Sequence, residues 1–156
     1  MRILFVCLGN ICRSPTAEAV MRGLLAEAGL DGEIEVESAG TGSWHIGSPR
    51  DPRSAAAAAD RGVELTGLAR QVDAADFEAF DLLVAMDRSN RGELLRIAPH
   101  DEARARVRLL REFGDGRDDD VPDPYFGGDE GFAEVLEIVE RCCRALLDEV
   151  RAERSA

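Results

Sequence analysis

The sequence contains no lysine. All 19 of its basic residues are arginine, 31 acidic residues outnumber them, and the net charge is −12. A protein that binds nucleic acid irrespective of sequence needs many lysine and arginine contacts to phosphate, and docking on an anionic membrane needs a basic surface. The charge balance therefore predicts that neither nucleic acid nor membrane is a partner. Arginine in place of lysine, with abundant alanine and glycine, favours a GC-rich bacterial genome as the source.

Long hydrophobic runs are missing as well. The apolar run at residues 3–6 is too short for the hydrophobic part of a signal peptide or for a membrane span. No other stretch approaches the roughly 18 apolar residues that a spanning helix requires. We therefore expect a cytoplasmic protein.

Cysteine is scarce. The four cysteines are Cys7, Cys12, Cys142 and Cys143, and their spacing fits no zinc site. Structural disulfides are rare in the cytoplasm. We therefore expect these side chains to be either reactive or simply buried, and we predict no metal.

Four segments have the patterns of β-strands. Residues 2–6 and 80–85 are mostly apolar, as in strands buried on both faces. Residues 33–37 alternate between acidic and apolar side chains, as in a half-exposed strand near a sheet edge, and residues 107–110 show a weaker pattern. Helical patterns lie between them, at residues 15–28 (with Pro15 at the first helical position), 51–61, 87–98 and 129–150. The expected loops are residues 38–50 and 111–128.

Strands that alternate with helices indicate a parallel sheet with helices on both faces. At 156 residues the chain is long enough for one domain with a proper core and too short for two. We therefore predict a single α/β domain spanning residues 1–156, built on a four-stranded parallel sheet. Ligands of such sheets bind beyond the carboxyl ends of the strands, where the loop after the first strand lies.

That loop, residues 7–14, starts with a cysteine at the end of a buried strand and reaches an arginine at a helix start after five intervening residues. Curled backbone N–H groups and the unpaired N–H groups of a helix start bind phosphate and favour a thiolate. Gly9 and Asn10 tolerate the positive φ that such a curl requires. Arg13 offers a planar fork for two phosphoryl oxygens, and Ser14 is placed to donate a hydrogen bond to the sulfur.

Each of these features is ordinary when it occurs alone. A cysteine after a strand is usually a core residue, an arginine at a helix start is usually solvated, and a Gly-Asn pair is usually a turn. Their combination between a buried strand and a proline-started helix favours a phosphate-binding loop.

Residues 6–18 (VCLGNICRSPTAE) resemble the signature of low-molecular-weight protein tyrosine phosphatases. The resemblance continues in order along nearly the whole chain, through residues 38–44, 51–53, 69–72, 86–90, 123–125 and 141–145. It implies a phosphate-binding loop made of Leu8, Gly9, Asn10, Ile11, Cys12 and Ser14.

The activity implied by this resemblance is hydrolysis of phosphotyrosine in two steps. The Cys7 thiolate attacks the phosphorus to form a cysteinyl phosphate, Arg13 clamps the phosphate, and Asp123 protonates the leaving phenolate and then assists water. An acid is needed because a phenolate, whose conjugate acid has a pKa of about 10, leaves slowly without help. The neighbouring Asp118, Asp119 and Asp120 are equally acidic, and only the resemblance selects Asp123.

The resemblance implies no metal or other cofactor, because backbone amides and Arg13 balance the phosphoryl charge. The implied partners are tyrosine-phosphorylated proteins, with inorganic phosphate as product and inhibitor. Trp44, Tyr125 and Phe126, together with Leu8 and Ile11, are expected to form apolar walls around a phenyl ring. Trp44 fits a structural plug equally well.

Supporting roles follow from the same resemblance. Ser38 is expected to brace Asn10, and Asp87 is expected to support the loop. Many family members have a histidine in place of Gly67, whose ring supports the loop asparagine, so we expect a less rigid loop here. Cys12 fits either a small packed side chain or a reversible disulfide partner for Cys7. The remaining candidates are placed outside the site: Cys142 and Cys143 in the core, and His45 and His100 at the surface or in loops.

Three alternatives have the same loop. A protein-arginine phosphatase tends to have threonine in place of Ile11 and phenylalanine in place of Tyr125. An arsenate reductase relays through cysteines in the middle of the chain, and residues 60–100 contain none. A non-catalytic phosphate-binding module is expected to lack the nucleophile or the acid, and both are present here.

Overall fold

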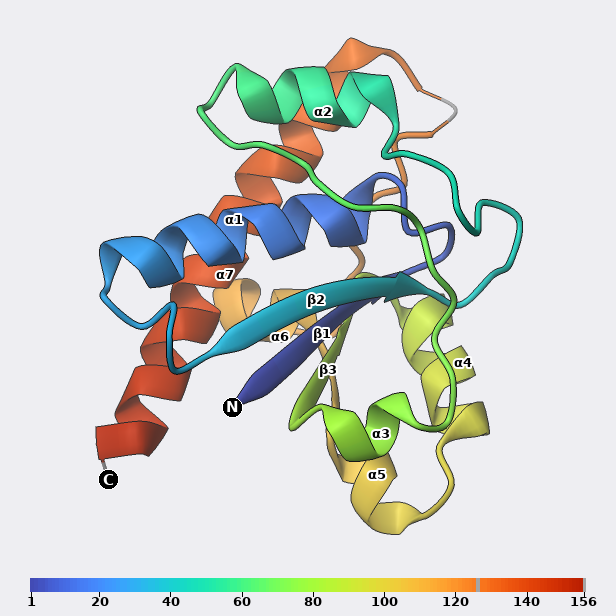
Figure 1. Cartoon of the computed structure of the whole chain (residues 1–156), viewed down its shortest axis with the longest axis vertical. Coiled ribbons are helices and arrows are strands. Elements are labelled where there is room, and N and C mark those ends of the chain that lie inside the picture. Colours follow the sequence, from blue (N-terminus) through green and yellow to red (C-terminus); the bar gives the residue numbers. More distant parts are fainter. Residues whose placement is uncertain (126, 156) are drawn as a thin grey trace.

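The computed structural model describes residues 1–125 and 127–155. Figure 1 shows a sheet with helices on both of its faces. The elements, in chain order, are β1 (Arg2–Cys7), α1 (Arg13–Glu27), β2 (Glu35–Gly40), α2 (Pro52–Ala59), α3 (Asp76–Ala79), β3 (Leu82–Ala85), α4 (Arg88–Ile97), α5 (Asp101–Ala105), β4 (Val107–Leu109), α6 (Leu110–Asp115) and α7 (Asp129–Ser155). The four strands are parallel and lie in the order β2-β1-β3-β4. The predicted fold class is confirmed.

Side chains along β1 alternate between two hydrophobic cores. Ile3, Phe5 and Cys7 pack with residues of α1 and α7, and Leu4 and Val6 pack with residues of α3, α4 and α5 on the other face. All five are buried. A strand covered on both faces has no position for a polar side chain, which explains the continuous apolar run in the sequence. The carboxyl end of β1 is therefore fixed from both sides.

Strand β2 is an edge strand, as its alternating pattern predicts, but it lies later in the chain than expected. It spans residues 35–40, and Ser38 and Gly40, predicted in a loop, pair with Phe5 and Cys7 of β1. Pairing with an existing strand supplies hydrogen-bond partners that override the weak strand propensity of serine and glycine.

The start of α1 also differs from the prediction. The helix begins at Arg13 with Cys12 as its N-cap, so Pro15 occupies the third helical position. Proline is tolerated there because the N–H groups of the first turn have no intrahelical partner. The helix therefore reaches directly into the phosphate-binding loop.

Three short helices were not predicted. Helix α6 takes the last residue of the strand that we expected at 107–110 and the start of the loop that we expected at 111–128. The Leu109 N–H donates to Glu112 Oε1 (3.0 Å), and Gly116 ends the helix with a φ of 65°. Helices α3 and α5 are too short to show a periodic pattern. Among the described residues, no helix is long and apolar enough to cross a bilayer.

Candidate active site

The segment between β1 and α1 curls around the Cys7 sulfur. The Asn10 N–H donates to Cys7 Sγ at 3.3 Å, and the Ser14 hydroxyl lies 3.0 Å from the same sulfur. Asn10 has a φ of 57°, whereas Gly9 does not have a positive φ. Our expectation of a positive φ was therefore right for Asn10 and wrong for Gly9. Gly9 instead allows the His45 ring to pack closely against the loop, because a Cβ at this position would lie 2.9 Å from that ring.

The amino-terminal end of α1 points into this curl without a side-chain cap. Within the part of the chain that the structure describes, Cys12 makes no capping hydrogen bond and the first turn contains no acidic residue. The N–H groups at a helix start and the positive end of its dipole attract an anion. Residues 7–14 thus form a curl that attracts an anion next to a thiol.

The Asn10 carboxamide ties the loop to the structure behind it. Its Nδ2 donates to Ser14 Oγ and to Ser38 Oγ, both at 2.9 Å. Its Oδ1 accepts the backbone N–H of Arg70 at 3.0 Å. The side chain is fully buried. The predicted brace between Ser38 and Asn10 is present.

Arg13 is 3% exposed and approaches the loop from the first turn of α1. Its Nη1 donates to Asp87 Oδ2 at 2.7 Å and to the Val121 carbonyl at 2.9 Å, and its Nη2 lies 3.6 Å from Asp123 Oδ2. Burial lowers the pKa of the guanidinium, but the charges of Cys7 and Asp87 raise it above its ordinary value overall. A permanent positive charge is therefore held beside the thiol.

Asp123 lines a pocket that opens beside Cys7 and Arg13. Its Oδ1 accepts the Tyr125 N–H at 3.1 Å, and its side chain is 42% exposed. The competing carboxylates do not line the pocket and are each paired with an arginine: Asp118 with Arg91, Asp119 with Arg117 and Asp120 with Arg88.

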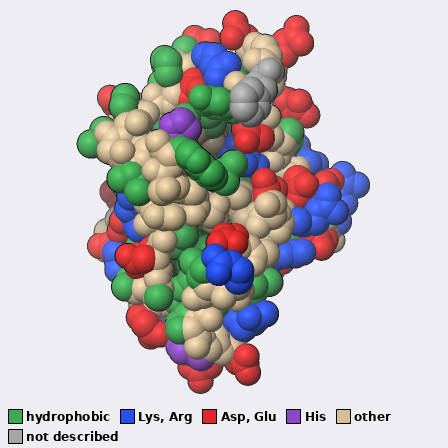
Figure 2. Space-filling view, turned by 90° about the vertical axis from the view of Figure 1, so that its right-hand side faces the viewer, with side chains coloured by type: hydrophobic (Ala, Val, Ile, Leu, Met, Phe, Trp, Pro, Cys, Tyr) green, Lys and Arg blue, Asp and Glu red, His purple; other side chains and the backbone are tan. Residues whose placement is uncertain are grey.

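The pocket has a volume of about 220 Å³. Figure 2 looks onto this side of the molecule and shows hydrophobic side chains gathered beside a histidine. The lining residues are Cys7, Leu8, Gly9, Ile11, Cys12, Arg13, Trp44, His45, Asp123 and Tyr125. The predicted walls Trp44 and Tyr125 are thus brought to the nucleophile, and Phe126 lies outside the described residues.

Sequence reasoning missed His45, which we expected to be an isolated surface residue. Its ring lies 6.0 Å from the Tyr125 ring, tilted by 54°, and covers Gly9. Trp44 is 73% exposed, so it does not plug the interior. The pocket wall is therefore made partly of aromatic rings on exposed loops.

The other three cysteines are buried side chains with raised pKa values. Burial raises the pKa of Cys12 to about 12, although a hydrogen bond with Ser54 acts in the opposite direction. Burial also raises the pKa values of Cys142 and Cys143, which have no exposed surface and pack in the core below α1. None of the four cysteines forms a disulfide. The raised pKa values hold Cys12, Cys142 and Cys143 in the neutral thiol form.

A family model described as low molecular weight phosphotyrosine protein phosphatase matches residues 2–156. The chain belongs to this family. The chain is 49% identical over 155 residues to a low molecular weight protein-tyrosine-phosphatase of Streptomyces coelicolor. The alignment covers 97% of this chain and 94% of the relative. The resemblance found in the sequence is confirmed.

Solved structures agree with this assignment. A protein tyrosine phosphatase from Entamoeba histolytica, crystallised with Hepes in the active site, superimposes with a TM-score of 0.95 at 38% identity, covering 99% of both chains. The arginine phosphatase YwlE, solved as a mutant with a phosphorylated active-site serine, has a TM-score of 0.90 at 27% identity and also covers 99% of both chains. The fold therefore serves two kinds of phosphorylated side chain among these relatives.

No group of three or more His, Cys, Asp or Glu side chains that could hold a metal ion occurs among residues 1–125 and 127–155. The predicted site residues that the structure describes either line the pocket of Cys7 or form hydrogen bonds with residues 7–14. The sequence did not reveal Val121 or His45 as members of the site. The role of Val121 cannot be predicted from its residue type, because its contact is made by the backbone carbonyl, which every residue has.

Proposed function

We propose that this chain is a protein-tyrosine-phosphatase that hydrolyses phosphotyrosine through a phosphoryl group carried on Cys7. The observation that supports this most directly is the geometry around the sulfur. The thiol lies at the uncapped start of α1, in contact with the Asn10 N–H and the Ser14 hydroxyl, and shares a pocket with Asp123.

In the first step Cys7 Sγ forms a bond to phosphorus while the bond from phosphorus to the phenolic oxygen breaks. Asp123 gives its proton to that oxygen, so the leaving group departs as a neutral phenol. Arg13 and the loop amides bind the equatorial oxygens as negative charge shifts across the phosphoryl group. The partly buried ion pair with Asp87 holds the guanidinium in place for this task.

In the second step a water molecule forms a bond to phosphorus and the sulfur leaves as a thiolate. Asp123, now a carboxylate, accepts a proton from the water. The Ser14 hydroxyl, 3.0 Å from Sγ, donates a hydrogen bond to the departing sulfur. The product is inorganic phosphate, which competes with substrate for the same loop and therefore inhibits.

The walls of the pocket favour an aromatic substrate. Trp44 and Tyr125 stand beside the loop with large exposed surfaces, and Leu8 adds an apolar side chain at the entrance. A phosphotyrosine ring extends far enough from the phosphorus to contact them, whereas phosphoserine is too short. We propose that the substrates are tyrosine-phosphorylated proteins in a bacterial cytoplasm, and that residues 1–156 act as one domain.

The test is turnover of a phosphotyrosine peptide by the wild type and by Cys7→Ser, with phosphoserine and phosphoarginine peptides and arsenate assayed in parallel. We expect phosphotyrosine to be preferred, Cys7→Ser to be inactive, and quenched wild type to carry phosphate on Cys7 by mass spectrometry. Preference for phosphoarginine would replace this proposal with the activity of the YwlE relative. Arsenate reduction in place of hydrolysis would contradict it altogether.

A further inference from the structure

The Asn10 carboxamide has no unused hydrogen-bonding position. Both protons of Nδ2 are donated, to Ser14 and Ser38, and Oδ1 accepts from two donors, the Arg70 N–H and the Arg50 guanidinium. Three of these four partners are a hydroxyl or a backbone group. Arg50 is the one cationic side chain among them.

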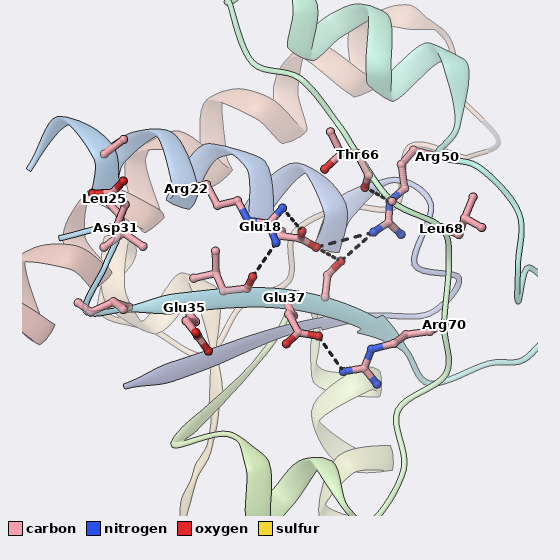
Figure 3. A pocket seen from close by; sticks show the side chains of 15 residues that line it. Glu18, Arg22, Leu25, Asp31, Glu35, Glu37, Arg50, Thr66, Leu68 and Arg70 are labelled. Carbon is pink, nitrogen blue, oxygen red and sulfur yellow. Dashed lines mark hydrogen bonds and ion pairs between the residues drawn. The ribbon is translucent and has the colours of Figure 1, made fainter. Parts of the chain in front are cut away.

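Arg50 reaches the loop from behind, opposite the substrate pocket. Its Nη1 donates to the Asn10 carbonyl at 2.6 Å and to Asn10 Oδ1 at 3.0 Å, and its Nε donates to the Thr66 carbonyl at 3.0 Å. Its Nη2 lies 3.7 Å from Glu18 Oε1 and 3.5 Å from Ser38 Oγ. Figure 3 shows the guanidinium between Glu18 of α1 and the Thr66 segment.

This guanidinium is enclosed by groups that fix its orientation. The Arg50 side chain is 7% exposed, and Glu18, which also pairs with Arg22 at 2.6 Å, is 9% exposed. A Cβ on Gly67 would lie 3.4 Å from Arg50 Nη2, which is van der Waals contact, so the guanidinium lies directly beside position 67. We expected Gly67 to leave the loop without support at this point, and Arg50 provides support there.

The contacts of Asn10 connect Arg50 to the nucleophile. Asn10 has a φ of 57°, a conformation that non-glycine residues rarely adopt and that needs support from its surroundings. In this conformation its N–H points at Cys7 Sγ, and its Nδ2 holds the Ser14 hydroxyl that also contacts this sulfur. Arg50 binds both the carbonyl and the side-chain oxygen of Asn10, so it opposes rotation of the residue in either direction.

We propose that Arg50 is a positioning residue of the phosphate-binding loop, which keeps the Asn10 amide and the Ser14 hydroxyl on the Cys7 sulfur. The inference rests on the proposed function for its effect on turnover, but its effect on the thiol does not require turnover. Arg50 touches neither the substrate pocket nor the sulfur. Its hydrogen bonds reach the loop through Asn10, directly and by way of Ser38, and its charge also acts on Cys7 through space.

The test compares Arg50→Met and Arg50→Lys with Arg108→Met. Arg108 is a suitable control because it is partly buried and paired with Glu112 at 2.7 Å, away from the loop. Two quantities are measured: kcat and KM on a phosphotyrosine peptide, and the pH midpoint of Cys7 alkylation, followed at that residue by mass spectrometry.

We expect Arg50→Met to lower kcat/KM roughly ten- to a hundredfold, as for the loss of charge-assisted hydrogen bonds, mainly through kcat. The midpoint of Cys7 alkylation should move to higher pH. Arg50→Lys should lie between the wild type and Arg50→Met in both kcat/KM and the alkylation midpoint, because its ammonium still reaches the Asn10 carbonyl. Arg108→Met should change neither quantity. If Arg50→Met does not fold, Arg50→Lys is compared with the wild type, and smaller changes of the same sign are expected in both quantities.

A purely structural role gives a different result. In that case Arg50→Met lowers the melting temperature but leaves kcat and the alkylation midpoint at their wild-type values, and the inference is overturned. If the wild type hydrolyses no phosphopeptide, the proposed function fails, and the alkylation midpoint still decides the role of Arg50.

Discussion

The Asp87 carboxylate lies 2.7 Å from Arg13 Nη1 and at the same time caps α4, because its Oδ1 accepts the Asn90 N–H at 2.6 Å. One side chain therefore joins the turn after β3 to the loop after β1. These strands are neighbours in the sheet, and their carboxyl ends lie side by side. The position of the phosphate clamp thus depends on a residue 74 positions away in the sequence.

Asp87→Asn tests this dependence. The amide keeps the cap on α4 but leaves the buried Arg13 charge without its partner, so we expect a loss of stability of about 1–3 kcal/mol. The activity should fall roughly tenfold in kcat/KM as the guanidinium loses its fixed orientation. Urea unfolding and steady-state kinetics measure the two effects.

Asp120→Asn is the matched control for Asp87→Asn, because it removes the same charge from an exposed pair with Arg88. Such pairs contribute about 0–1 kcal/mol. Equal effects of the two substitutions on stability would show that burial of the Arg13–Asp87 pair is unimportant.

Asp123→Ala tests the assignment of the acid. Loss of a general acid slows departure of a poor leaving group by roughly 10²–10⁴-fold. We therefore expect a large loss of kcat on phenyl phosphate and a much smaller loss on p-nitrophenyl phosphate, whose leaving group needs little protonation. Asp119→Ala, outside the pocket, should retain the wild-type ratio of the two rates. An equal loss on both substrates by Asp123→Ala would contradict the role as acid.

Gly40→Ala tests how closely β2 approaches the loop. A Cβ at this position would lie 2.7 Å from the Leu8 carbonyl oxygen and 3.2 Å from the Asn10 nitrogen, and backbone atoms cannot move aside as a flexible side chain can. We expect a destabilisation of about 1–3 kcal/mol, as for other overpacked sites, together with loss of activity. Thermal unfolding and kcat/KM measure both.

Gly92→Ala is the control for the same chemical change. Its Cβ would meet nothing within 4 Å, and the residue lies inside α4. Replacement of a helical glycine by alanine stabilises by roughly 0.5–1 kcal/mol. If Gly40→Ala were equally well tolerated, the close approach of β2 to the loop would be wrong.

The pH dependence of stability provides a further prediction, at Asp115. The hydrogen bond from Arg111 Nε (2.6 Å) is the main cause that holds the pKa of this carboxyl below its ordinary value, and Arg141 of α7 adds to it. Because the folded-state pKa is depressed, the stabilisation is present above the unfolded-state pKa of about 3.9. It is lost as the pH falls through the lower folded-state value.

Asp115→Asn should therefore be less stable than the wild type at pH 7, by roughly 1 kcal/mol for a partly exposed ion pair. The difference should shrink as the pH is lowered below about 4. Urea unfolding of both proteins over this pH range measures it. A difference that stays constant with pH would show that the effect is not due to the charge of Asp115.

The elements that could be predicted are those whose sequence pattern lies within the element itself. The buried strands β1 and β3 are revealed by apolar runs, and α7 by its helical period. The loop at residues 7–14 is also local, since the proposed nucleophile, the asparagine with positive φ and the proposed clamp all lie within it. The elements α3, α5 and α6 were missed because each is too short to show a helical period of its own.

By itself, the sequence determined that a thiol and a guanidinium meet at the start of a helix, because a single loop of eight residues carries both. Only the tertiary structure decided what holds them there: Asp87 and the Val121 carbonyl on Arg13, Arg50 on Asn10, and the His45 ring over Gly9. These partners come from segments distant in the chain, and it is the pairing and packing of the strands that brings them within hydrogen-bonding distance.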